Sequence, residues 1–309
     1  MSDPKRERLI GHTAIPATQS GGGCLILFAL PFITVGVGTI LFSLGYLNIE
    51  AQSGNDAPPW LLTAFGSVFA LAGLAVAWGG VTGMYRARAA RKRKDEHPLE
   101  PWFWDHPWDS RRAESGGLGP AIQSFMAFLF LSAFLSMFNW WAFFSDQGPW
   151  PVKLIVIVFD VITLAVLGGA IYLLFQYFKY GKSRLHFARF PFRPGRSVEA
   201  GLEAGSRLAA APSIDLTLRY IEEVTETTGS GKNRSSTQVL YCLHEVKQEL
   251  RAGQFDPTSA MAIPISIRLP DGDYANRLLE TPRRYWELEV KAETPGIDYS
   301  ARFLLPVYR

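Results

Sequence analysis

Four long stretches that are almost free of charge constrain this 309-residue chain more than any other feature. They cover residues 24–46, 61–84, 121–145 and 154–178. A helix that crosses a membrane needs about 20 mostly apolar residues, whereas a long helix of a soluble protein carries a polar face. Only 19% of the chain is charged, below the roughly 25% of soluble domains. We therefore predict a four-span transmembrane domain over residues 24–178.

The charges that flank these stretches predict their orientation. Lys and Arg occur in the segment 1–23, in the loop 85–120 and after the fourth span, but not in 47–60 or 146–151. Basic loops remain on the cytoplasmic side of a membrane. We expect a multi-pass protein with a cytoplasmic N-terminal segment 1–23, a cytoplasmic middle loop 85–120 and a cytoplasmic C-terminal domain.

Small residues form a regular stripe in the second stretch: Gly66, Ala70, Gly73, Ala77 and Gly80. Their spacings of three and four place them on one helix face. Small residues let two helix backbones approach closely in lipid. We expect the stripe to pack against another helix of the same chain, or against a second copy in a homo-oligomer.

Asp160 is the only ionisable side chain well inside a predicted span. A carboxylate within a membrane is costly and is a functional suspect. Asn139 lies at a comparable depth in the third span, so its amide is a candidate hydrogen-bond partner. The pair is either a structural hydrogen bond or part of a proton or ion pathway.

The middle loop combines a basic run with an aromatic segment. The basic run ends in Arg91, Lys92, Arg93 and Lys94, and it is followed by Trp102, Phe103, Trp104 and Trp108. Basic residues attract anionic lipids, and tryptophan favours the membrane interface. We expect the segment to contact membrane lipids flat on the inner surface, or to pack under the cytoplasmic domain.

Three potential metal ligands accompany the aromatic segment: Asp105, His106 and Asp109. One His and two carboxylates within a few residues form no specific ligand pattern. We predict no metal site here.

The C-terminal region 183–309 changes to an alternation of every second residue, which is typical of strands. Seven such runs are present, and seven short strands indicate a β-sandwich. The overall prediction is an α+β membrane protein: a four-helix bundle followed by an antiparallel seven-stranded β-sandwich. Pro264 interrupts one run, and proline is confined to edge strands and bulges. The candidate partner-binding edge is therefore the strand with Ile263, Pro264, Ile265 and Ile267.

Two of these runs carry a family resemblance. Ile263-Pro264-Ile265-Ser266-Ile267-Arg268-Leu269-Pro270, followed after a loop by Tyr285-Trp286-Glu287-Leu288-Glu289-Val290-Lys291-Ala292, resembles the central part of an arrestin-like sandwich. Arrestins have two lobes, and one lobe fits here. The whole chain also resembles uncharacterised bacterial inner-membrane proteins that join hydrophobic hairpins to a β domain. The resemblance implies a binding scaffold in a bacterial inner membrane.

The residues indicate no enzyme chemistry. None of the five His lies in a recognised catalytic or metal-binding motif. The run Gly229-Ser230-Gly231-Lys232 lacks the remaining residues of a phosphate-binding loop, so we expect no cofactor. The net charge of +3 is too small to indicate nucleic-acid binding.

The leading hypothesis is therefore a non-enzymatic membrane scaffold, or an accessory subunit of a membrane complex, that binds a protein partner through its β-sandwich. One alternative is a small proton- or ion-coupled transporter or channel that uses Asp160. A third is an enzyme that acts on lipid head groups at residues 102–109 and depends on His106.

Overall fold

The structure is a computed structural model that describes residues 6–14, 22–47, 58–144, 149–204, 208, 211–229, 234–251 and 263–309. The chain divides into a helical unit, residues 19–88 and 118–174, and a β unit, residues 1–18, 89–117 and 175–309. Parts of the segment 1–23 and of the loops 47–60 and 146–151 lie outside the described residues. So do residues 230–232 of the predicted loop that imitates a phosphate-binding motif.

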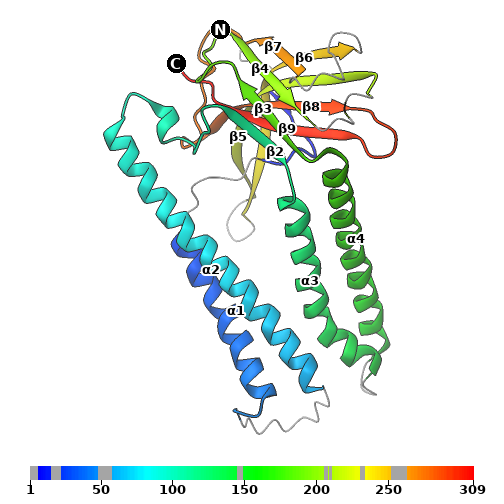
Figure 1. Ribbon diagram of the computed structural model, residues 1–309. Coiled ribbons are helices and arrows are strands. Elements are labelled where there is room, and N and C mark those ends of the chain that lie inside the picture. Colours follow the sequence, from blue (N-terminus) through cyan, green and yellow to red (C-terminus); the bar gives the residue numbers. More distant parts are fainter. Residues whose placement is uncertain are drawn as a thin grey trace. The chain divides into compact units, whose positions relative to one another are not determined.

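Four helices are long and apolar enough to cross a membrane (Figure 1). Their bounds are α1 Gly22–Ser43, α2 Pro59–Glu96, α3 Gly119–Asn139 and α4 Trp150–Tyr180, and the π-helical turn η2, Trp140–Phe144, continues α3. Each helix covers most or all of one of the four stretches that are almost free of charge, although α1 ends three residues before the predicted end at residue 46. The coarse pattern of four apolar helices therefore follows directly from the sequence.

Helix α2 extends twelve residues past the predicted end at residue 84, as far as Glu96. The added residues are mainly Ala, Arg and Lys, which are strong helix formers. Pro98 follows, and a proline disfavours helical backbone at the residue before it. The basic run is thus the last part of a helix, and its charges remain mostly exposed.

The described residues form nine strands in two antiparallel sheets. The five-stranded sheet has the order β1-β6-β5-β8-β9, and the four-stranded sheet has the order β2-β3-β4-β7. The bounds are β1 Glu7–Arg8, β2 Arg112–Gly116, β3 Lys182–Phe187, β4 Ser197–Glu203, β5 Ser213–Thr228, β6 Ser235–Arg251, β7 Ile263–Arg268, β8 Arg283–Ala292 and β9 Tyr299–Leu305.

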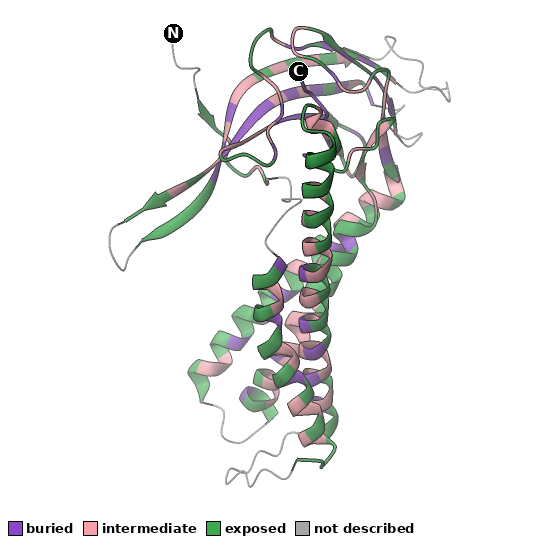
Figure 2. Cartoon of the chain, turned by 90° about the vertical axis from the view of Figure 1, so that its left-hand side faces the viewer, coloured by how far each residue is buried: buried purple, intermediate pink, exposed green. Residues whose placement is uncertain are grey.

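One hydrophobic core serves both sheets. Val198 and Ile265 come from the four-stranded sheet, and Leu216, Trp286 and Phe303 come from the five-stranded sheet. The alternating residues of each strand supply these side chains. Beyond the core, the outer end of the β5–β6 hairpin is mostly exposed (Figure 2).

Two strands come from outside the predicted range 183–309. β1 belongs to the N-terminal segment and pairs with β6, and β2 belongs to the middle loop and pairs with β3 along its whole length. Strands of two and five residues are too short to show a clear alternation. The β unit is therefore assembled from three parts of the chain, instead of only from the C-terminal region.

Candidate functional site

The intramembrane carboxylate Asp160 is held by the amide that the sequence suggested. Asn139 Nδ2 donates a hydrogen bond to Asp160 Oδ1 at 2.9 Å. The same amide lies 3.3 Å from the Leu135 carbonyl of its own helix, which fixes the side chain. Among the described residues, the other carboxylate oxygen of Asp160, Oδ2, has no hydrogen-bond partner. The pair thus orients one oxygen of the carboxylate and leaves the other available.

A pocket of about 480 Å³ surrounds this pair. Small polar side chains and large aromatic ones share the wall, which consists of Trp60, Leu61, Phe128, Ser132, Ser136, Asn139, Trp140, Phe144, Asp160, Thr163 and Leu164. The hydroxyl groups of Ser136 and Thr163 donate to backbone carbonyls of their own helices. Of the described residues in the lining, only Asp160 carries a charge.

The π-helical turn η2 begins directly after Asn139 and carries two of the aromatic residues in the pocket wall, Trp140 and Phe144. The rings of these two residues stack with centroids 5.3 Å apart. Single π-helical turns within α-helices occur frequently at functional sites. No feature of the sequence had indicated this turn.

The stripe of small residues on α2 faces α1. A Cβ atom added at Gly66 would lie 2.7 Å from the Gly36 carbonyl oxygen, and one at Gly73 would lie 2.9 Å from the Ile33 amide nitrogen. One at Gly80 would lie 2.7 Å from the carbonyl oxygen of Gly22. Ala70 is buried and Ala77 half-buried on the same face. Of the two expected arrangements, the described residues show packing within the chain.

The aromatic segment of the middle loop packs on the C-terminal end of the chain. Trp108 Nε1 donates to the Tyr308 hydroxyl at 3.0 Å, and the ring of Trp102 lies 6.1 Å from that of Tyr308. Phe103 and Trp104 are exposed and half-buried, respectively. Of the two expected placements, this one corresponds to packing against the β unit.

The basic run occupies the last turns of α2. Arg91, Lys92 and Arg93 are exposed, and Lys92 forms an ion pair with Glu96 at 3.8 Å. Lys94 lies over the ring of Trp104, with 4.9 Å between its Nζ and the ring centroid. Most charges of the basic run are thus exposed.

Asp105 holds the aromatic segment in place. Its oxygens accept hydrogen bonds from the backbone amides of Leu278 and Leu279 and from the Tyr308 hydroxyl, at 3.0–3.1 Å. Burial raises the pKa of Asp105, although these hydrogen bonds oppose the shift. The carboxyl group of Asp105 therefore has a structural role, which is to hold the aromatic segment against Tyr308 and the backbone of residues 278–279.

His106 packs beside Trp108, with ring centroids 4.5 Å apart. Burial lowers the pKa of His106 to about 4, so the ring is neutral near pH 7. Among the described residues, no group of three or more His, Cys, Asp or Glu side chains is arranged to hold a metal ion.

The candidate partner-binding strand β7 ends the four-stranded sheet. Ile265 and Ile267 are 2% and 3% exposed, and Ile263 packs against the same core. The three isoleucines therefore point toward the core, with Ile265 and Ile267 buried and Ile263 half-buried. The exposed side chains of β7 are those of Pro264, Ser266 and Arg268.

Among the described residues, the backbone groups of β7 that have no hydrogen-bond partner lie on its outer edge. The Leu269 amide donates to the Arg196 carbonyl at 3.0 Å, on the side of β4. Amide groups of successive strand residues point to opposite sides, so those of Ser266 and Arg268 point away from β4. Pro264 shares this side, where its missing N–H leaves the pairing with β4 intact.

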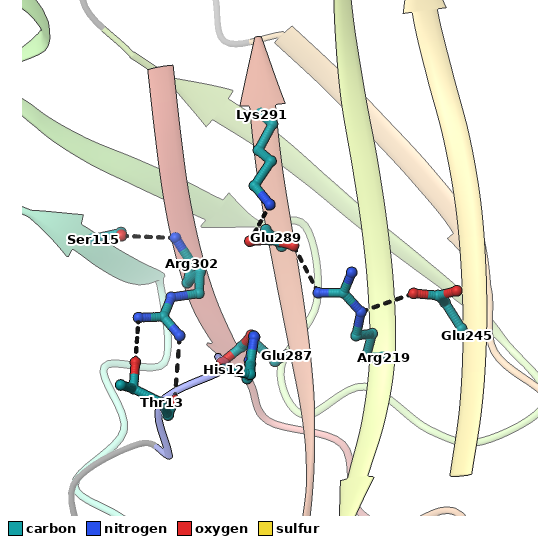
Figure 3. Close-up of polar contacts among 9 residues, drawn as sticks. All are labelled: His12, Thr13, Ser115, Arg219, Glu245, Glu287, Glu289, Lys291 and Arg302. Carbon is teal, nitrogen blue, oxygen red and sulfur yellow. Dashed lines mark hydrogen bonds and ion pairs between the residues drawn. The ribbon is translucent and has the colours of Figure 1, made fainter. Parts of the chain in front are cut away.

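A network of ionised side chains on the outer face of the five-stranded sheet was not predicted. Arg219 donates to Glu289 at 2.6 Å and to Glu245 at 2.8 Å, and Lys291 pairs with Glu289 at 2.9 Å (Figure 3). Burial opposes ionisation of Glu289, but the hydrogen bonds from Lys291 and Arg219 outweigh it and lower its pKa.

The N-terminal segment covers part of this face. His12 Nε2 lies 2.7 Å from Glu287 Oε1, and the guanidinium group of Arg302 donates to the side chain and backbone oxygens of Thr13 (Figure 3). Glu287 is only 1% exposed as a result. Glu287 lies between the core residues Trp286 and Leu288 and therefore on the opposite face of β8, and the alternation of the strand contains no information about the segment that covers this face.

Comparisons with known proteins give little further guidance. No protein-family model and no curated protein matches this sequence. Among solved structures, Spo0M, a sporulation control protein from Bacillus subtilis, is similar, with 12% sequence identity and a TM-score of 0.23. The match covers 41% of this chain and about half of Spo0M, 49%. A TM-score this low carries no argument about function.

Proposed function

We propose that this protein is a non-enzymatic, membrane-anchored scaffold that binds an extended segment of a protein partner along the edge of β7. The single observation that supports it most directly is the outward direction of the Ser266 and Arg268 amides at the end of a sheet. An exposed strand edge binds an added strand through main-chain hydrogen bonds.

The other sheet ends are less suited to this role. β2 and β9 contact one another, and the Arg302 amide of β9 donates to Ser115 of β2 at 2.9 Å. β6 is paired with β1 at Tyr241 and Cys242. Beyond this pairing, β6 carries the alternating charges of Glu245, Lys247 and Glu249, a composition that discourages strand addition.

The proposal also assigns the scaffold a fold and a location in the cell. We infer an arrestin-like β-sandwich on the cytoplasmic side of a bacterial inner membrane, anchored by four spans. The shared core of the two sheets, the four apolar helices and the alternation of basic and neutral loops are consistent with it. A scaffold needs no catalytic set, and the partner would be a cytoplasmic protein or the cytoplasmic part of a membrane complex.

A matched pair of substitutions at one residue tests the β7 edge in the full-length chain. Ser266→Pro removes an outward amide and leaves the bonds to β4 in place. Ser266→Ala removes the hydroxyl and keeps the amide. Each tagged variant is extracted gently from its native membrane, and the proteins that co-elute in stoichiometric amounts are quantified by mass spectrometry.

We expect Ser266→Pro to lose a partner that both the wild type and Ser266→Ala retain. The melting temperature of each purified variant serves as the control for folding. A partner that remains bound to a correctly folded Ser266→Pro variant would contradict binding along this edge.

A further inference from the structure

We propose that the pocket around Asp160 is a binding site for a lipophilic organic cation, a monovalent positive charge that carries apolar groups. The pocket lies within the helical unit. The inference therefore stands independently of partner binding along β7.

The charge of the pocket favours a cation. Among the described residues of the lining, Asp160 is the one ionisable group, and no basic side chain accompanies it. The Asn139 amide donates to Oδ1 and so holds the carboxylate in place. Oδ2 has no hydrogen-bond partner among the described residues. A positive charge beside Oδ2 would compensate the cost of a carboxylate in an apolar environment.

The wall of the pocket favours a ligand with apolar groups. Trp60, Phe128, Trp140 and Phe144 supply aromatic surface, and aromatic faces attract cations. A bare inorganic cation such as Ca²⁺ or Mg²⁺ takes about six or more oxygen ligands. Among the described residues, Asp160 is the one strong ligand of the lining, because the Asn139 amide turns its N–H toward Asp160 and the hydroxyls of Ser136 and Thr163 donate to backbone carbonyls. An organic cation instead uses both the carboxylate and the surrounding rings.

The size of the pocket is also suitable. Its volume of about 480 Å³ falls within the roughly 300–1,000 Å³ of small-molecule sites. A second cavity of about 360 Å³, between α3 and α4, has an entirely apolar lining that includes Phe134, Trp141 and Phe159. That second cavity lacks a charged residue, so we assign the cation to the pocket around Asp160 alone.

The test measures binding of two probes of the same shape and opposite charge to the purified full-length protein in detergent. Tetraphenylphosphonium is the cation and tetraphenylborate the anion, each measured separately by equilibrium dialysis. Asp160→Asn removes the charge and keeps the size of the side chain. Val158→Phe, two residues away on an exposed position of α4 and outside the pocket lining, controls for nonspecific partitioning.

We expect saturable binding of tetraphenylphosphonium to the wild type and to Val158→Phe, about tenfold or more weaker binding to Asp160→Asn, and no saturable binding of tetraphenylborate. Equal affinity of the wild type and Asp160→Asn, or equal affinity for both probes, would overturn the proposal. Ser132→Phe narrows the pocket without changing its charge. If Asp160→Asn does not fold, unchanged binding to Ser132→Phe would overturn the proposal instead.

Discussion

The carboxylates of the β unit and of the helical unit differ in their partners. In the β unit, three buried glutamates have cationic partners: Arg284 binds Glu222, Arg283 binds Glu223, and Arg219 and Lys291 bind Glu289. In the helical unit, the half-buried Asp160 has only the neutral amide of Asn139 as a hydrogen-bond partner among the described residues.

This difference distinguishes the glutamates of the β unit, whose ion pairs stabilise the fold, from Asp160, which is available to bind a ligand. A buried ion pair fixes the position of its elements, and breaking it is costly; this holds although Glu222 and Glu223 each keep one oxygen without a hydrogen bond. A carboxylate that lines a pocket and has no cationic partner among the described residues, such as Asp160, can instead bind a cation. The helical unit obtains its cohesion from other contacts, namely the close approach of α1 and α2 and the rings of Phe65, Phe69, Phe130 and Phe134 between α2 and α3.

The largest effect is expected from breaking a buried ion pair of the β unit. Arg284 donates twice to Glu222, at 2.7 and 2.9 Å, and Glu222 is 1% exposed. Arg284→Met leaves this carboxylate with only Arg6, 3.5 Å away, and should lower the free energy of unfolding by about 3 kcal/mol. Denaturant titration in mild detergent measures this change in the free energy of unfolding. Arg268→Met, at an exposed position, is the control, and equal stability of the two variants would contradict the prediction.

A somewhat smaller loss of stability is expected when the pH is lowered. The pKa of His106 is lowered by burial to about 4. Below pH 6.5 the unfolded chain therefore binds a proton that the folded chain excludes, and stability falls as the pH decreases toward 4. Between pH 7 and 5 the loss should be about 2 kcal/mol.

The same denaturant titrations at both pH values, on the wild type and on His106→Gln, isolate this contribution. The variant should lose about 2 kcal/mol less than the wild type over this pH range. Identical pH dependence of the two proteins would show that His106 takes up its proton in the folded state as readily as in the unfolded chain.

The smallest effect concerns the helical unit. Gly66→Ala places a methyl group 2.7 Å from the Gly36 carbonyl oxygen, so α1 and α2 must separate, at a cost of about 1 kcal/mol or more. Gly79→Ala, on the same helix, meets no atom within 4 Å and should be neutral or stabilising. The melting temperatures of the two variants in detergent measure this difference in stability. A Gly66→Ala variant as stable as Gly79→Ala would show that this close approach is unimportant.

The sequence by itself determined the features that depend on local composition. Runs without charge produce apolar helices, and alternating residues produce strands with an inward face, as with Leu216 in β5 and Val290 in β8. The proximity of Asn139 and Asp160 was also predictable, because neighbouring spans with a short connection place residues of similar depth side by side.

Only the tertiary structure decided which surfaces become covered. His12 reaches Glu287 from 275 residues away, and Trp108 reaches Tyr308 from 200 residues away. The sequence did not indicate which helix packs against the stripe on α2, or that the isoleucines of β7 point into the core. Periodicity specifies that a face is apolar or polar, whereas the partner of that face depends on contacts between distant segments.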